Sequence, residues 1–171
     1  MKKYWITGVS GTGKTTVAQE LEKRGYYVID VEESDGLCAW WSNESETFVN
    51  FPDVVTAEFS EAHEWKLNMQ KLEQMINTKQ SSVILVGMND TLKEQINIFE
   101  KVFILRCDPD VFITRLKTRN NNDFGKDESM QQNILSWYEK YEAKMVSAGA
   151  ISIDASQSVA IVADQIDQQL S

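Results

Sequence analysis

The sequence lacks the features of secreted proteins, of membrane proteins and of proteins that bind a metal through cysteine and histidine. Its 171 residues include two cysteines and one histidine, and Cys38, Cys107 and His63 form neither a CxxC pair nor a metal-ligand spacing. Free thiols are typical of a reducing compartment. No apolar run reaches the ~20 residues of a membrane span, and the first apolar stretch stops at Gly8, too early for a signal peptide. We therefore expect a cytoplasmic protein with no membrane partner.

Clusters of basic residues are also lacking. The formal net charge is −9, and the four arginines are Arg24, Arg106, Arg115 and Arg119. Because a surface that binds a nucleic-acid duplex needs clustered Lys and Arg, we exclude nucleic acid as a main partner. The acidity does not exclude a nucleotide such as ATP, since exposed charges more than ~8 Å away are largely screened at physiological salt.

Five apolar segments predict the strands of one parallel sheet. They lie at 4–7, 26–31, 83–86, 102–105 and 151–154, and helical patterns separate them. One helix is expected to start at Pro109 with Asp108 as its N-cap, and another to run over 128–147. Alternation of strands and helices is typical of an α/β fold with helices on both faces of the sheet. The sequence therefore predicts one three-layer α/β/α domain over residues 1–171.

Two segments do not fit this alternation. Residues 32–52 contain turn signals, and the stretch from Asp53 to about Asn77 is interpreted as a helix from its apolar residues, which begin at Trp65. Residues 120–127 are polar and rich in turn-forming residues. We therefore expect a helical lobe at about 32–77 and a short mobile lid at about 120–127.

A phosphate-binding motif lies between the first strand and the first helix. Residues 8–16 read Gly-Val-Ser-Gly-Thr-Gly-Lys-Thr-Thr and satisfy GxxxxGK[ST]. Such a loop aims backbone N–H groups and a helix N-terminus at phosphates, while the lysine bridges the β- and γ-phosphates and the hydroxyl after it completes the Mg²⁺ shell. The residues expected to bind the nucleotide here are Gly8, Ser10, Gly11, Thr12, Gly13, Lys14, Thr15 and Thr16.

The position of the motif makes a glycine-rich turn without a ligand the weaker interpretation. The dinucleotide fingerprint GxGxxG is absent, which excludes an NAD site, and no Asn/Thr-Lys-x-Asp segment is present to select GTP. The sequence therefore predicts a P-loop NTPase fold that binds ATP and Mg²⁺.

Arg115 and Arg119 form a second candidate element. They are four residues apart at the end of a helix, so they share one face, directly before the expected lid. Basic residues also favour a helix C-terminus for electrostatic reasons alone. Beside a P-loop, two guanidinium groups can stabilise charge on a transferred phosphoryl group, and this interpretation is favoured.

Together the P-loop, Asp30 at the end of the second strand, the Arg115/Arg119 pair and Ile153–Ser156 resemble the P-loop small-molecule kinases. This group includes adenylate kinase-like and shikimate kinase-like enzymes, and the lid segment resembles that of a bacterial branch. The resemblance covers nearly the whole chain, but it is specific only at the P-loop.

The resemblance implies roles for individual residues. Arg115 would lie against the adenine or the phosphates, and Arg119 would reach the transferred phosphoryl group. The backbone around Asp154 and Ala155 would flank the adenine. Asp30, with Glu32 in place of a second Asp, would help to hold Mg²⁺ and the acceptor hydroxyl. The lobe at about 32–77 would bind the acceptor.

The sequence departs from these kinases in the acceptor lobe. Relatives of this kind clamp an anionic acceptor with arginines, whereas no arginine lies between Arg24 and Arg106. An anion would have to be met by backbone groups or by Lys66, Lys71 or Lys79, which lack the bidentate fork of arginine. A nucleoside monophosphate is therefore disfavoured as the acceptor.

The third strand is not followed directly by an acidic residue. Support for Mg²⁺ could therefore come from Asp30 or from Asp90 through water, and both remain open. Thr15 and Asp30 are taken as the metal-binding pair.

The sequence thus predicts an ATP-dependent kinase for a small metabolite or nucleotide-like acceptor, with Lys14, Asp30, Arg115 and Arg119 as catalytic residues. The alternative is a P-loop ATPase that acts as a nucleotide-dependent switch through a protein partner. The identity of the acceptor and the choice between monomer and homodimer stay open.

Overall fold

Five parallel strands form the central sheet of the computed structural model, which describes residues 1–34, 36–50, 59, 62–77, 82–94, 96–120 and 125–170. In spatial order the strands are β2 (Tyr27–Asp30), β6 (Val83–Val86), β1 (Lys3–Thr7), β7 (Lys101–Arg106) and β8 (Ile151–Asp154). They fall on the five apolar segments, so the predicted five-stranded parallel sheet is confirmed.

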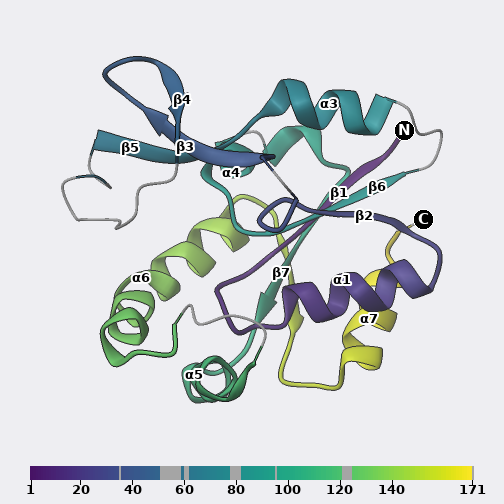
Figure 1. The fold of residues 1–171 in the computed structure, drawn as a ribbon. Helices are drawn as coiled ribbons and strands as arrows, with labels where there is room; N and C mark the ends of the chain where they lie inside the picture. The colour runs from purple at the N-terminus through teal and green to yellow at the C-terminus, as the bar shows by residue number, and fades with distance from the viewer. Residues whose placement is uncertain are drawn as a thin grey trace.

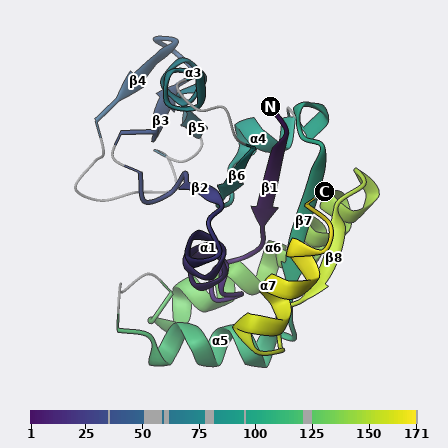
Figure 2. The ribbon, with the colours of Figure 1, turned by 90° about the vertical axis from the view of Figure 1, so that its right-hand side faces the viewer.

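Helices cover both faces of this sheet (Figures 1 and 2). Side chains alternate along β1, so Tyr4 and Ile6 pack on one face and Trp5 on the other. The first face is covered by α1 (Lys14–Lys23) and α7 (Val159–Asp167), and the second by α3 (Met69–Asn77), α4 (Asp90–Glu94) and the end of α6 (Glu128–Ser147). The predicted three-layer arrangement is confirmed.

A smaller cluster packs below the P-loop, where α5 (Pro109–Thr118) meets α6. Val9 of the loop lies fully buried with Phe112, Leu116 and Ile134. The structure begins α5 at Pro109 with Asp108 at the N-cap and bounds α6 at Glu128 and Ser147, as predicted. This packing gives the loop a rigid support.

The prediction of a helical lobe is wrong for much of the described part of residues 32–77. The strands β3 (Cys38–Ser42), β4 (Thr47–Val49) and β5 (His63–Leu67) form an antiparallel sheet in the order β4-β3-β5 (Figure 1). The helix α3 begins only at Met69.

Periodicity explains the error. Trp65, Leu67 and Met69 recur every second residue, which is the period of a strand, and helical spacing starts only from Met69. Trp65 lies opposite Trp40 in the pairing of β5 with β3, and their rings meet edge to face at a centroid distance of 5.4 Å. Cross-strand aromatic pairs of this kind stabilise antiparallel sheets.

The rest of the lobe and lid predictions fall partly outside the described residues. Residues 53–58, 60 and 61 of the stretch predicted as a helix from Asp53 lie there, as do residues 121–124 of the expected lid. A short 3-10 helix, η1 (Ile96–Ile98), completes the elements. Within the ranges that the structure describes, no helix combines the length and apolar composition needed to cross a membrane.

Candidate functional site

The P-loop connects β1 to α1 at the carboxyl edge of the sheet. Gly8 and Gly11 have φ values of +148° and +87°, which side chains rarely tolerate. A Cβ on Gly8 would lie 2.6 Å from the carbonyl oxygen of Leu105, and one on Gly11 would lie 2.6 Å from that of Phe112. Glycine is therefore required at both positions, because the loop backbone approaches β7 and α5 too closely for any side chain.

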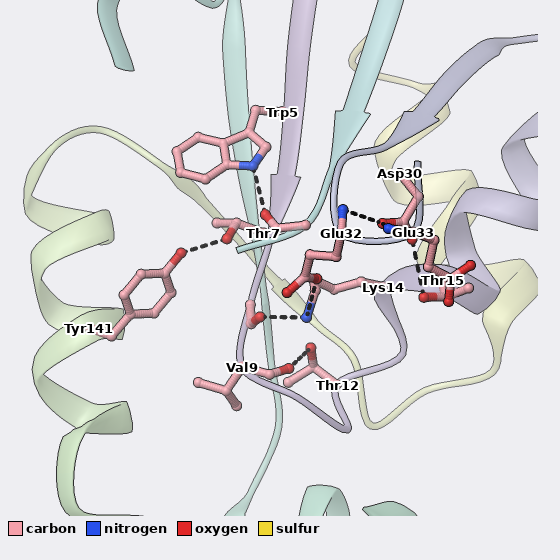
Figure 3. A network of polar contacts seen from close by, with 12 residues as sticks. Trp5, Thr7, Val9, Thr12, Lys14, Thr15, Asp30, Glu32, Glu33 and Tyr141 are labelled. Carbon is pink, nitrogen blue, oxygen red and sulfur yellow. Dashed lines mark hydrogen bonds and ion pairs between the residues drawn. The ribbon is translucent and has the colours of Figure 1, made fainter. Parts of the chain in front are cut away.

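Lys14, the first residue of α1, lies at the centre of this loop. Its side chain is mostly buried, and its ammonium donates a hydrogen bond of 2.9 Å to the carbonyl oxygen of Gly8. It also forms an ion pair with the carboxylate of Glu32 at 3.6 Å (Figure 3). A buried ammonium needs such partners, because leaving a buried charge unpaired is costly.

Thr15 and Asp30 meet where β2 ends. The hydroxyl of Thr15 donates to Oδ2 of Asp30 at 3.3 Å, while Oδ1 of Asp30 accepts the backbone N–H groups of Glu32 and Glu33 (Figure 3). Two oxygen atoms that can act as metal ligands thus lie together beside the P-loop. Mg²⁺ binds through one or two protein oxygens together with substrate phosphates, so this pair fits that ion.

Carboxylates continue from Asp30 along the chain. Partial burial raises the pKa of the Glu33 carboxyl, and the nearby carboxylates of Asp30 and Glu32 raise it further. The three carboxylates concentrate negative charge at the end of β2. Lys14 offsets only the charge of Glu32.

Arg115 and Arg119 approach the loop from α5. The Nη1 atom of Arg115 donates a 2.9 Å hydrogen bond to the carbonyl oxygen of Ala155, and it lies 4.0 Å from the position of a Cβ on Gly13. Arg119 is the C-cap of α5 and has left the helical conformation. The guanidinium of Arg115 therefore bridges the P-loop and the segment after β8.

These groups line one cavity of about 650 Å³. It brings together most of the residues predicted to bind nucleotide, phosphoryl group or metal: Ser10, Gly11, Thr12, Gly13, Lys14, Thr15, Thr16, Asp30, Arg115, Arg119 and Ala155. Gly8 shapes the loop through its backbone and does not line the cavity.

Asp154 lies outside this cavity. Its carboxylate accepts hydrogen bonds from the side chain and backbone N–H of Ser156 and from the side chain of Gln157, which lower its pKa. Asp154 instead lines a second cavity, of about 950 Å³, between α6 and the ends of β7 and β8. Its contacts hold the turn that presents Ala155 and Gln157 to the P-loop.

The structure adds cavity residues that sequence reasoning missed: Val17, Glu33, Met88, Thr118, Gln157, Val159 and Val162. Glu33 carried a signal, since it follows Asp30 and Glu32 directly after a strand. Met88 follows β6, the strand between β1 and β2. Its place at the site depends on the strand order, which spacing alone does not reveal.

The lobe lysines have partners of their own. Lys66 pairs with the carboxylate of Glu64 at 2.8 Å and lies over the ring of Trp41, 5.4 Å from its centroid. The ammonium of Lys71 lies 3.0 Å from the position of a Cβ on Gly36. Neither lysine lines the cavity. Lys79 and the side chain of Asp90 lie outside the described residues.

Both cysteines are free thiols. Burial raises the pKa of Cys38 to about 12, and burial also raises that of Cys107. Thiolates are the nucleophilic form, so these side chains act as small packing residues at neutral pH.

Comparisons with known proteins agree with this geometry. Residues 5–136 match the family model described as an AAA domain. A dephospho-CoA kinase from Streptococcus mutans is 29% identical, with 96% of this chain and 94% of that protein covered. A nucleotide-binding protein from Lactobacillus delbrueckii subsp. bulgaricus is 32% identical over 90 residues, which span 51% of this chain and 31% of that protein.

Solved structures share the fold. A shikimate kinase from Acinetobacter baumannii in complex with shikimate superposes with a TM-score of 0.65 at 17% identity, covering 99% of this chain and 93% of that one. A deoxyadenosine kinase from M. mycoides gives a TM-score of 0.59 at 18% identity, covering 98% and 97%.

Proposed function

The chain belongs to the family whose AAA domain model matches residues 5–136, and on this premise we propose that it is an ATP-dependent kinase that phosphorylates a small molecule. One observation carries the proposal. Lys14, the Thr15–Asp30 pair, Arg115 and Arg119 line a single cavity at the carboxyl edge of the sheet. That is the set of charges needed to hold and transfer a phosphoryl group.

The P-loop binds the phosphates. Backbone N–H groups between Gly8 and Thr16 and the N-terminus of α1 supply the donors, and Lys14 moves from Glu32 to the β- and γ-phosphates. Arg115 and the backbone at Ala155 lie against the adenine or the α-phosphate. Asp154 supports this contact indirectly, through the turn that it holds.

Thr15 and Asp30 hold Mg²⁺, directly or through water. The ion neutralises charge on the phosphate oxygens when it is bound. Oδ1 of Asp30 stays engaged by two backbone N–H groups, which fixes the orientation of the carboxylate.

Transfer depends mainly on positioning and electrostatics. The acceptor hydroxyl oxygen forms a bond to the γ-phosphorus while the bond from that phosphorus to the β,γ-bridging oxygen breaks, and ADP leaves with the electron pair. Asp30 orients the acceptor hydroxyl or accepts its proton. Arg119, aided by Arg115, stabilises charge on the transferred group.

The rest of the chain completes the site. We assign the acceptor to the lobe at about 32–77 and a closing lid to about 120–127, within a single domain. The kinase names among the relatives favour this function over a nucleotide-dependent switch that acts through a protein partner.

Acceptor-dependent release of ADP tests the proposal. Calorimetry first measures binding of Mg-ATP, and a panel of hydroxyl-bearing metabolites is then screened for ADP release above basal hydrolysis. A kinase shows stimulation by particular acceptors, with one phosphorylated product per ADP. Basal hydrolysis that no acceptor stimulates, together with a protein that binds only the ATP state, would instead establish the switch.

A further inference from the structure

The acidic charge of this protein is concentrated in one segment. Residues 30–77 contain eleven Asp and Glu, two Lys and no Arg, so their formal charge of −9 equals the net charge of the whole chain. The rest of the chain is balanced. The excess negative charge therefore belongs to the end of β2 and to the proposed acceptor lobe.

The cavity is divided in the same way. Among the described residues that line it, the cationic side chains are Lys14, Arg115 and Arg119, which come from α1 and the end of α5. The anionic side chains are the carboxylates of Asp30, Glu32 and Glu33, which come from the end of β2 and the residues that follow it, with Lys14 paired to Glu32 where the two groups meet. One half of the cavity suits a triphosphate, and the other half repels anions.

The lysines of the lobe do not change this balance at the cavity. Lys66 is engaged by Glu64 and by the ring of Trp41, and neither it nor Lys71 lines the cavity. Among the described residues that line the cavity, an anionic acceptor next to the end of β2 would therefore meet three carboxylates, with Lys14 as the nearest cation.

Nucleotide binding increases this imbalance. Lys14 is the counter-ion of Glu32 at 3.6 Å, and the phosphates of ATP draw the lysine of a P-loop to themselves. Glu32 then loses its partner while its backbone N–H stays bonded to the carboxylate of Asp30 and Glu33 lines the same cavity beside it. A carboxylate left in that position favours a new cation.

We propose that the acceptor is a hydroxyl compound that carries a protonated amino group, and that its ammonium replaces Lys14 beside Glu32, with Glu33 as a second partner. This inference rests on the proposed kinase function. The acceptor hydroxyl still attacks the γ-phosphorus, with ADP as the leaving group and Asp30 as the residue that orients the hydroxyl or takes its proton. The amino group binds and stays unmodified.

Binding of the two substrates is then coupled. An amine binds weakly while Lys14 neutralises Glu32, and more tightly once the nucleotide has taken Lys14. Coupling between two ligands is reciprocal, so the amine also tightens nucleotide binding by the same factor.

Matched hydroxyl compounds of three charge classes test the proposal. The amines include glucosamine and other amino sugars and amino alcohols, the neutral class includes glucose and adenosine, and the acids include glucuronate and AMP. Acceptor-stimulated ADP release is measured with Mg-ATP, and binding is measured by calorimetry with and without a non-hydrolysable Mg-ATP analogue. We expect amines to be preferred by at least ~10-fold in kcat/KM and to bind more tightly when the analogue is present.

Variants locate the preference. Glu32→Gln and Glu33→Gln should each reduce the preference for amines over neutral compounds by ~3-fold or more. Glu44→Gln is the matched control, because Glu44 belongs to the same lobe, is exposed and does not line the cavity. If the Glu44→Gln protein lost the preference for amines to the same extent, the proposed contact with Glu32 and Glu33 would be overturned, since only the overall charge of the protein would then matter.

The outcomes separate the two proposals. Stimulation by the acids or only by the neutral compounds would overturn this inference and leave the kinase function standing. Amines that bind equally well with and without the nucleotide would overturn the replacement of Lys14. Failure to bind Mg-ATP would remove the kinase function itself, and Mg-ATP hydrolysis that no charge class stimulates would overturn both.

Discussion

The two halves of the cavity are built in different ways. The nucleotide half depends on nine consecutive residues, Gly8 to Thr16, held between β1 and α1, with Arg115 brought over them from α5. The proposed acceptor half is lined by the carboxylates at and after the end of β2, and the chain then forms a three-stranded antiparallel sheet. The first is basic and made of backbone donors, whereas the second is acidic and made of side chains.

Because of this difference, the two halves recognise different parts of the substrates. Backbone N–H groups recognise phosphates by geometry, so nearly any P-loop protein binds them in the same manner. Side-chain charges select among acceptors, because an unpaired or repelled charge beside the γ-phosphate weakens binding. Changes in the first half should therefore abolish turnover, and changes in the second should alter which acceptor is used.

The largest expected effect comes from Lys14→Ala. Turnover should fall by at least ~10²-fold, about 2.7 kcal/mol of transition-state stabilisation, because the variant loses a cation aimed at the transferred group. Steady-state ADP release measures the loss, and circular dichroism checks the fold. Lys23→Ala, an exposed lysine in the last turn of the same helix, is the control. Near-normal turnover in the Lys14→Ala protein would contradict the assignment.

A glycine pair separates close packing of the loop from backbone strain. Gly11 and Gly149 have similar φ values, +87° and +97°, but a Cβ meets Phe112 O at 2.6 Å only at Gly11 and has no neighbour within 4 Å at Gly149. We expect Gly11→Ala to lower the free energy of unfolding by about 2 kcal/mol more than Gly149→Ala does, because overpacking adds to the strain. Urea unfolding of both variants measures the difference. Equal losses would mean that the loop yields to the added methyl group.

The Asp30→Asn variant tests the boundary between the halves. The amide oxygen can keep the hydrogen bonds from Glu32 and Glu33, but the negative charge beside Thr15 is lost. The Mg²⁺ concentration for half-maximal activity should rise by roughly 10-fold, the usual cost of losing a metal-orienting group. A Mg²⁺ titration at saturating ATP gives this value, with Asp110→Asn on the exposed start of α5 as the control. An unchanged titration would assign Mg²⁺ to other ligands.

The smallest effect is expected from Lys66→Met in the lobe. Its ion pair with Glu64 is partly exposed, so its loss should change the free energy of unfolding by less than ~1 kcal/mol. The KM of the acceptor identified by the panel should not rise, since Lys66 does not line the cavity. Thermal unfolding and acceptor kinetics measure both, beside an exposed control, Lys140→Met. An increase in KM would show that the lobe holds an anion after all.

Much of the parallel sheet could be predicted because its signals are local. Each buried strand is a short apolar run, and Asp108 followed by Pro109 marked the start of α5. The three strands of the lobe lack such runs. They are partly exposed, and β3 pairs with β5 across a long gap in the sequence, so alternation around Trp65 was interpreted as part of a helix.

The candidate site likewise contains residues that a local pattern predicts and residues whose place depends on the fold. The P-loop residues are adjacent in the sequence, so their pattern alone predicted a phosphate site. Met88 was missed because its place in the cavity depends on β6 lying between β2 and β1, whereas Glu33 directly follows Asp30 and Glu32 and carried a local signal. The backbone around Asp154 and Ala155 was expected to flank the adenine, and this stays a prediction; Ala155 lines the cavity, while the carboxylate of Asp154 holds the turn after β8.

By itself, the sequence determined the P-loop and the alternation of strands and helices. The P-loop is a motif of adjacent residues, and each strand or helix follows from the spacing of apolar residues within it. Tertiary structure alone decided that Arg115 would bond to Ala155 forty positions away, that Thr15 would meet Asp30, and that Lys14 would be the counter-ion of Glu32. These contacts join different elements, and only the packing of the elements around the sheet sets the distance between them.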